Sequence, residues 1–96
     1  MSPEDTTPAE LQALLGQQVV LDTRTPFVYI GTLQSANAES LTLTEVDVHD
    51  ARETTTSTDR YLIETVKHGI RVNRRQVIVL AREVVSACAL SDVVPY

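Results

Sequence analysis

The sequence predicts a mainly β domain, in which five antiparallel strands form a small, strongly bent barrel. Two observations predict this class. Short apolar segments are separated by turn residues, and the apolar pattern is interrupted inside two of these segments, as in strands that bend sharply. The chain has 96 residues, of which 43% are apolar, so it can build one core but not two domains. Because aromatic residues make up only 4%, this core must consist of Val, Leu, Ile and Ala.

A helix is expected before the first strand, after a flexible segment at residues 1–6. Thr7-Pro8-Ala9-Glu10 has the pattern of a capping box, with Thr at the N-cap and Pro at the first helical position. Leu11, Leu14 and Leu15 then share one helical face, and Gly16 is suited to a left-handed stop. This helix is expected to cover an open end of the barrel. The single domain spans residues 7–96.

Three strands with short turns are expected next, at residues 18–23, 27–36 and 41–48. Turn residues separate them at 24–26 and 37–40. Gly31 lies in the middle of the second strand, where glycine often marks a bulge or a sharp bend. In the third strand the apolar positions change phase between Leu43 and Val46, which also indicates a bulge.

An insertion of about residues 49–75 separates the third strand from the fourth. It begins with a polar loop and continues as a helix at 59–68, capped by Ser57 or Thr58 and ended by Gly69. The apolar stripe of this helix consists of Leu62, Ile63 and Val66. A strand is the alternative interpretation, because Tyr61-Leu62-Ile63 has β character.

The last two strands are expected at 77–81 and 84–90, joined by a tight turn at Arg82-Glu83. Both strands are apolar on both faces, whereas a strand in a small antiparallel sheet normally has one face in water. Something must therefore cover the second face or the edge, and a neighbouring subunit is the most economical candidate. Cys88 lies on the last strand and is expected to be buried.

The charge distribution is strongly polarised. The net charge is −5, but residues 60–82 carry six basic residues against the single acid Glu64, a net of +5. The rest of the chain carries two arginines against twelve acids, a net of −10. A basic segment on an acidic body can bind an anion, or it can join oppositely charged faces of neighbouring subunits.

The sequence contains no arrangement typical of an enzyme, a metal centre or a cofactor site. His49 and Asp50 have no second histidine at ligand spacing, and Cys88 has no histidine or aspartate partner nearby in sequence. The longest apolar run, residues 77–81, is too short to span a membrane, and no secretory signal is visible. With a single cysteine, a cytoplasmic protein that does not associate with membranes is expected.

Several segments resemble the conserved motifs of the Sm-like (LSm) family. LLGQQVVL at 14–21, YIGTL at 29–33 and LTLTE at 41–45 look like the first Sm motif, and VIVLAREVV at 77–85 resembles the second. The resemblance implies a ring of six or seven identical subunits, in which the fourth strand of one subunit pairs with the fifth strand of the next. The interface residues that it implies are Val77, Val79, Ala81, Val85 and Ala87.

The resemblance also implies binding of single-stranded RNA, often rich in uridine. The family's pocket uses an Asp and an Asn in the turn after the second strand, and these positions fall on Asn37 and Ser40. Its Arg-Gly pair falls on Leu80 and Ala81, although the adjacent Arg82 is a possible substitute. Glu39 in the same turn would repel phosphate. The uridine pocket is therefore degraded.

A second route to RNA is the basic segment. The candidate RNA-binding residues are Asn37, Ser40, Lys67, Arg71, Arg74, Arg75 and Arg82. Two alternatives remain open. The arginines of the segment could instead pair with acids of the same or the next subunit, namely Asp47, Asp50 or Glu53. The chain could also be an oligomeric scaffold that binds proteins and no RNA.

Overall fold

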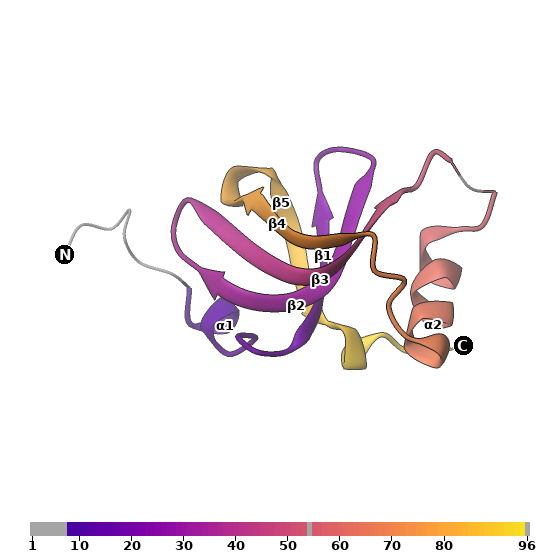
Figure 1. Ribbon diagram of the computed structural model, residues 1–96, viewed down its shortest axis with the longest axis horizontal. Helices are drawn as coiled ribbons and strands as arrows, with labels where there is room; N and C mark the ends of the chain where they lie inside the picture. The colour runs from indigo at the N-terminus through magenta and orange to yellow at the C-terminus, as the bar shows by residue number, and fades with distance from the viewer. Residues whose placement is uncertain (1–7, 54, 96) are drawn as a thin grey trace.

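The computed structural model describes residues 8–53 and 55–95, and its centre is an open five-stranded antiparallel sheet in the order β4-β3-β2-β1-β5 (Figure 1). The expectation of a mainly β fold with one helix before the strands and one after the third is confirmed. The elements are α1 (Ala9–Gln12), β1 (Gln18–Thr23), β2 (Phe27–Ala36), β3 (Ser40–Asp50), α2 (Thr58–His68), β4 (Arg74–Leu80) and β5 (Val84–Ala89), with 3₁₀ turns at Ala81–Glu83 and Leu90–Asp92. Thr7 of the expected capping box and residues 1–6 lie outside the described range.

The sheet bends at the two places where the sequence pattern breaks. The register between β2 and β3 shifts between Ile30 and Thr32, on either side of Gly31. A Cβ atom at Gly31 would lie 3.1 Å from the carbonyl oxygen of Thr44, so only glycine fits without displacing β3. Across from it, Glu45 has a φ of 52°, which is uncommon for a residue with a side chain. The expected bulges in both strands are confirmed.

The inner face of the bent sheet carries a core of aliphatic residues: Val19, Leu21, Leu33, Leu41, Leu43, Val46 and Val79. Leu11 and Leu14 pack against this core from the N-terminal side, as expected. The helix is shorter than expected, however. It ends at Gln12, and the side chain of Leu15 is 43% exposed. The reason is that the amide of Gly16, whose φ is +82°, donates to the carbonyl of Leu33 and draws the chain onto β2.

A second core lies on the opposite face of β1 and β2, and α2 covers it. It consists of Val20, Val28, Ile30, Leu62 and Leu90. The helix at this position is confirmed and the strand alternative is wrong. Ser57 Oγ accepts from the amide of Arg60 at 3.2 Å, and Gly69, with a φ of 89°, ends the helix. The inserted helix is therefore packed into the fold.

The last two strands differ from the expected bounds. β4 begins at Arg74 instead of residue 77. The reason is that the residues from Arg74 onward already pair with β3, where Arg74 lies opposite Val46. β5 ends at Ala89, where the 3₁₀ turn begins. The expectation that Cys88 is buried is wrong: β5 turns Ala87 and Ala89 toward the core, so the alternation directs the cysteine outward and leaves it exposed.

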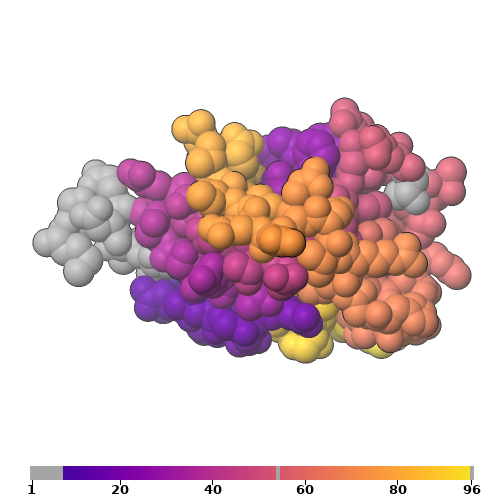
Figure 2. All heavy atoms as spheres, viewed as in Figure 1, coloured from indigo at the N-terminus to yellow at the C-terminus, as the bar shows by residue number. Residues whose placement is uncertain are grey.

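Both outer strands of the sheet have one unpaired edge. β4 pairs only with β3, and β5 pairs only with β1. Three apolar side chains remain uncovered there: Ile78 is 62% exposed, Leu80 43% and Val85 66%. The surface of β4 and of the residues before it, orange in Figure 2, runs across one face of the molecule.

In the described part of the chain, no helix is long and apolar enough to cross a membrane.

Candidate functional site

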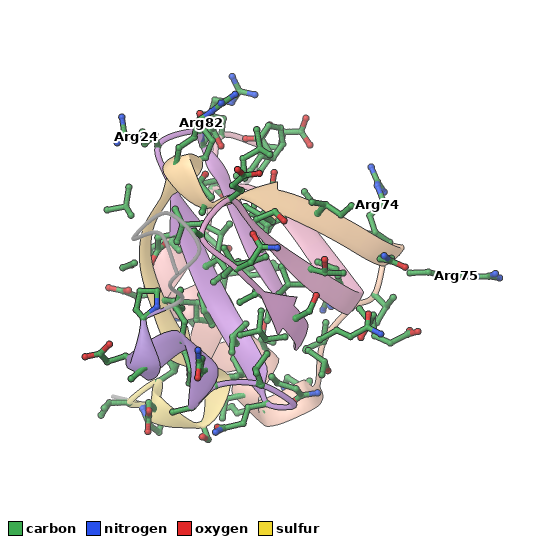
Figure 3. The ribbon with its side chains drawn as sticks, turned by 90° about the vertical axis from the view of Figure 1, so that its left-hand side faces the viewer. Arg24, Arg74, Arg75 and Arg82 are labelled. Atoms are coloured by element: carbon green, nitrogen blue, oxygen red, sulfur yellow. The ribbon has the colours of Figure 1, made fainter. Side chains whose placement is uncertain are left out.

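The structure separates the seven candidate RNA-binding residues into two groups. Asn37, Ser40 and Arg82 lie at the C-terminal end of β4, whereas Lys67, Arg71, Arg74 and Arg75 lie before or at its start. The strand between the two groups is roughly 20 Å long at the usual rise per residue. In Figure 3, Arg82 projects from the top of the molecule near Arg24, while Arg74 and Arg75 project from its side. The candidates therefore do not form one site.

The group around Asn37 is organised by its own turn. The side-chain oxygen of Asn37 accepts from the amides of Glu39 and Ser40 at 2.8 and 2.9 Å, so it already has two hydrogen bonds. Arg82 lies beside this turn, with Nε 3.9 Å from Oε1 of Glu83. An open hollow of about 450 Å³ is lined by Ala38, Glu39, Leu80 and Arg82. A carboxylate and a single arginine on its walls make this hollow a weak place for a phosphate.

The other group contains what we call the arginine segment: Arg71, Arg74 and Arg75. All three are exposed, and among the residues that the structure describes no carboxylate lies within ion-pair distance of any of them. Within residues 8–53 and 55–95, their guanidinium groups make one hydrogen bond, from Arg74 Nη1 to the carbonyl of Asn73 at 2.9 Å. The segment therefore presents three guanidinium groups to solvent.

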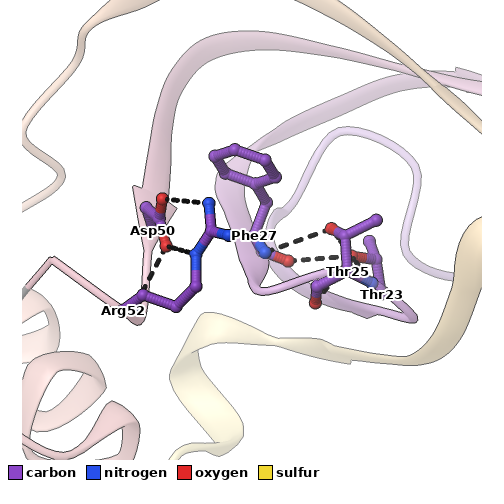
Figure 4. Close-up of polar contacts among 5 residues, drawn as sticks. All are labelled: Thr23, Thr25, Phe27, Asp50 and Arg52. Carbon is purple, nitrogen blue, oxygen red and sulfur yellow. Dashed lines mark hydrogen bonds and ion pairs between the residues drawn. The ribbon is translucent and has the colours of Figure 1, made fainter.

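Two of the acids suggested as partners of the arginine segment, Asp50 and Asp47, have other partners in the same chain. Arg52 binds Asp50 through two hydrogen bonds of 3.0 and 2.9 Å, which hold the pKa of Asp50 below its usual value (Figure 4). The same arginine lies 6.0 Å from the centre of the Phe27 ring. In Figure 4 the adjacent β1–β2 turn is closed by Thr23 and Thr25, whose hydroxyls are 2.7 Å apart. Asp47 is only 2% exposed and belongs to a separate cluster.

That cluster joins α2 to β3 and to the connector before β4. The hydroxyl of Tyr61 donates to Asp47 Oδ2, and Asn73 Nδ2 donates to Asp47 Oδ1 at 3.1 Å. The side chain of Asn73 also makes two hydrogen bonds to the backbone of Val48. Its Oδ1 accepts from the Val48 amide at 3.0 Å, and its Nδ2 donates to the Val48 carbonyl at 3.2 Å. His49 stacks on Tyr61 with ring centres 3.6 Å apart. The polar residues flanking the arginine segment are thereby fixed in place.

This cluster was not apparent from the sequence. Tyr61 appeared there only in the strand alternative for Tyr61-Leu62-Ile63, and His49 only as a loop residue without metal partners. The available signal was Asp47, an acid between the apolar residues Val46 and Val48, since a buried carboxylate needs hydrogen-bond donors. The fold supplies these donors from α2 and from the connector before β4.

The stability of the protein should fall in strongly alkaline solution because of Tyr61. Partial burial, reinforced by the hydrogen bond to Asp47, raises the pKa of Tyr61 from 10 to about 12. Folding therefore favours the neutral phenol: the stabilisation is complete below pH 10 and is lost as the pH rises toward 12. Urea unfolding at pH 9 to 12 should show a steeper decline for the wild type than for Tyr61→Phe. Equal slopes would contradict this role of the phenol.

The five residues implied as interface residues have different environments in the single chain. Val79 is buried in the inner core, and Val77, Ala81 and Ala87 pack against that core. Val85 alone among them is largely exposed. The outward positions of β4 are occupied instead by Ile78 and Leu80, which the resemblance did not single out. The side chains available to a neighbouring subunit are therefore Ile78, Leu80 and Val85.

No protein-family model, curated protein or solved structure matches the chain. The function is therefore inferred from the chemistry of the surfaces described above. Two of them stand out: the unpaired edges of β4 and β5, and the arginine segment beside the start of β4.

Proposed function

We propose that this chain is an Sm-like subunit that assembles edge to edge into a closed ring and binds single-stranded RNA through its arginine segment. The strand order supports this, because a bent five-stranded sheet that ends in β4 and β5 has two edges to offer. A heterologous contact between them closes into a ring when the rotation per subunit divides a full turn.

The side chains along the two edges are complementary. If β4 pairs antiparallel with β5 of a second copy, like every other pair in this sheet, the end of β4 meets the start of the partner's strand. Ile78 and Leu80 then approach Val85, and all three exposed apolar side chains are removed from water. The arginine end of β4 approaches the acidic turn at Leu90–Asp92. An exposed apolar edge left unpaired would promote aggregation.

The observation that carries RNA binding is the absence of a carboxylate partner for the arginine segment among the described residues. Three exposed guanidinium groups that are not neutralised within the described part of the chain are suited to phosphate oxygens. In a ring the segment is repeated once per subunit, so one strand can contact several copies at high effective concentration. The net charge of −5 is repeated in the same way, so binding depends on the local positive charge of the segment and not on the net charge of the ring.

Arg74→Glu should weaken the binding of a short single-stranded RNA at least about tenfold, since the change replaces a phosphate contact by a repulsion in every subunit. The slope of affinity against salt concentration should also become smaller. Native mass spectrometry and fluorescence anisotropy with a labelled oligonucleotide measure both quantities.

Arg24→Glu is the matched control, because it changes the net charge equally but lies on the turn between β1 and β2, away from Arg74 and Arg75 (Figure 3). An equal loss in both variants would show that net charge alone matters. A wild-type assembly that binds no RNA would overturn RNA binding and favour a protein-interaction scaffold.

A further inference from the structure

A small pocket lies directly beside the arginine segment, between α2 and the connector that leads to β4. Its volume is about 220 Å³. It is lined by Thr56, Tyr61, Glu64, Thr65, His68, Gly69 and Arg71. Pockets for drug-sized ligands usually measure about 300–1,000 Å³, so this one is suited to a single small ring system.

We propose that this pocket holds one base of the bound RNA strand, stacked against Tyr61, and that it accepts cytosine in preference to uracil. The inference rests on the proposed RNA binding and adds a base-specific contact to it. It differs from the uridine preference that the Sm-like resemblance implies.

The aromatic ring needed for stacking is provided by Tyr61. One face of its ring is covered by His49, with an angle of 13° between the two planes. The hydroxyl of Tyr61 donates a hydrogen bond to Asp47, so the orientation of the ring is fixed before any ligand arrives. Tyr61 is one of the residues that line the pocket, and stacking of a base on an aromatic side chain adds sequence-tolerant affinity for single strands. In the proposed complex the base extends the stack of His49 and Tyr61.

The preference for cytosine follows from Glu64. Its carboxylate lines the pocket and is held by His68, whose Nε2 lies 3.2 Å from Glu64 Oε2. A carboxylate can only accept hydrogen bonds, and cytosine offers the N4 amino group where uracil has a carbonyl oxygen. Arg71 borders the same pocket and belongs to the arginine segment, so in this proposal its guanidinium contacts the phosphate of the bound nucleotide.

The test compares three labelled strands of equal length by fluorescence anisotropy: oligo-cytidine, oligo-uridine and an abasic strand with the same phosphates. We expect oligo-cytidine to bind about three- to tenfold more tightly than oligo-uridine, the effect of one hydrogen bond. The abasic strand should bind most weakly, because it retains only the phosphate contacts.

Glu64→Gln should abolish the preference while the overall affinity is kept or increased. The amide can accept from cytosine N4 or donate to uracil O4, and the change removes one negative charge. The side chain of Glu64 is 45% exposed, so this variant should fold normally. Glu10→Gln is the matched control on α1, at the other end of the molecule (Figure 1), and should keep the wild-type preference.

The results separate this inference from the proposed function. If all three strands bind equally and Arg74→Glu still weakens them, the base pocket is wrong and the phosphate contacts stand. If oligo-uridine is preferred, or if Glu64→Gln keeps the cytidine preference, the assignment of Glu64 is overturned. If no strand binds, both proposals fail together.

Discussion

Val85→Asp is expected to convert the assembly into monomers. Val85 is 66% exposed in the single chain, and in the proposed ring it lies in the contact between β5 and the neighbouring β4. A carboxylate there would be buried without a partner in every interface of the ring, and the cost of an unpaired buried charge exceeds what a short edge contact supplies. The mass of the particle, measured by native mass spectrometry, should fall to that of one 10.6 kDa chain.

Val94→Asp is the matched control for this prediction. Val94 is exposed to a similar extent, 58%, and lies after the last 3₁₀ turn and outside both edge strands. The control variant should keep the wild-type mass. Because Val85 is exposed in the single chain, the circular dichroism spectrum of the Val85→Asp monomer should still show a folded protein. A Val85→Asp protein with unchanged mass, or a monomeric wild type, would refute pairing through these edges.

Leu62→Ala should lower the free energy of unfolding by about 2–4 kcal/mol, the usual range for removing a buried leucine side chain. Leu62 is 8% exposed and is the buried apolar residue of α2 in the core with Val20, Val28 and Ile30, against which Tyr61 also packs. Its loss leaves a cavity between the helix and the outer face of the sheet. Urea denaturation followed by circular dichroism gives the free-energy difference directly.

The matched control lies one turn further along the same helix. Val66 is 40% exposed, and Val66→Ala should change stability by no more than about 0.5 kcal/mol. Similar small effects for both variants would mean that α2 is not anchored through Leu62. A large effect for Leu62 alone would establish the helix as part of the folded core and not as an appended insertion.

The elements predicted correctly from the sequence are those fixed by local signals. β1 and β2 begin and end at the expected residues, and α2 is bounded by Ser57 and Gly69 as expected. Gly31 marked the bend because glycine within a strand indicates a close approach of another segment. Capping residues and turn residues act over a few positions, so a single sequence is enough to identify them.

Features that depend on contacts between distant segments could not be predicted in this way. Tyr61 reaches an acid 14 residues earlier in the chain, and Asn73 reaches the same acid across 26 residues. Tyr61 and Arg71 are ten residues apart in the sequence, yet folding places both on the walls of one pocket. Conversely, Arg82 and Arg74 are close in sequence but are separated by the length of β4. Proximity in the chain was a poor guide to the composition of the site.

The position of β1 between two cores has a consequence for how the molecule unfolds. Val19 and Leu21 belong to the inner core, whereas Val20 between them belongs to the core beneath α2. A fluctuation that lifts the helix exposes Val20, and loosening Val20 disturbs both of its neighbours in the strand. Local opening on one side is therefore transmitted to the other, so that the helix and the sheet should unfold in a single cooperative transition.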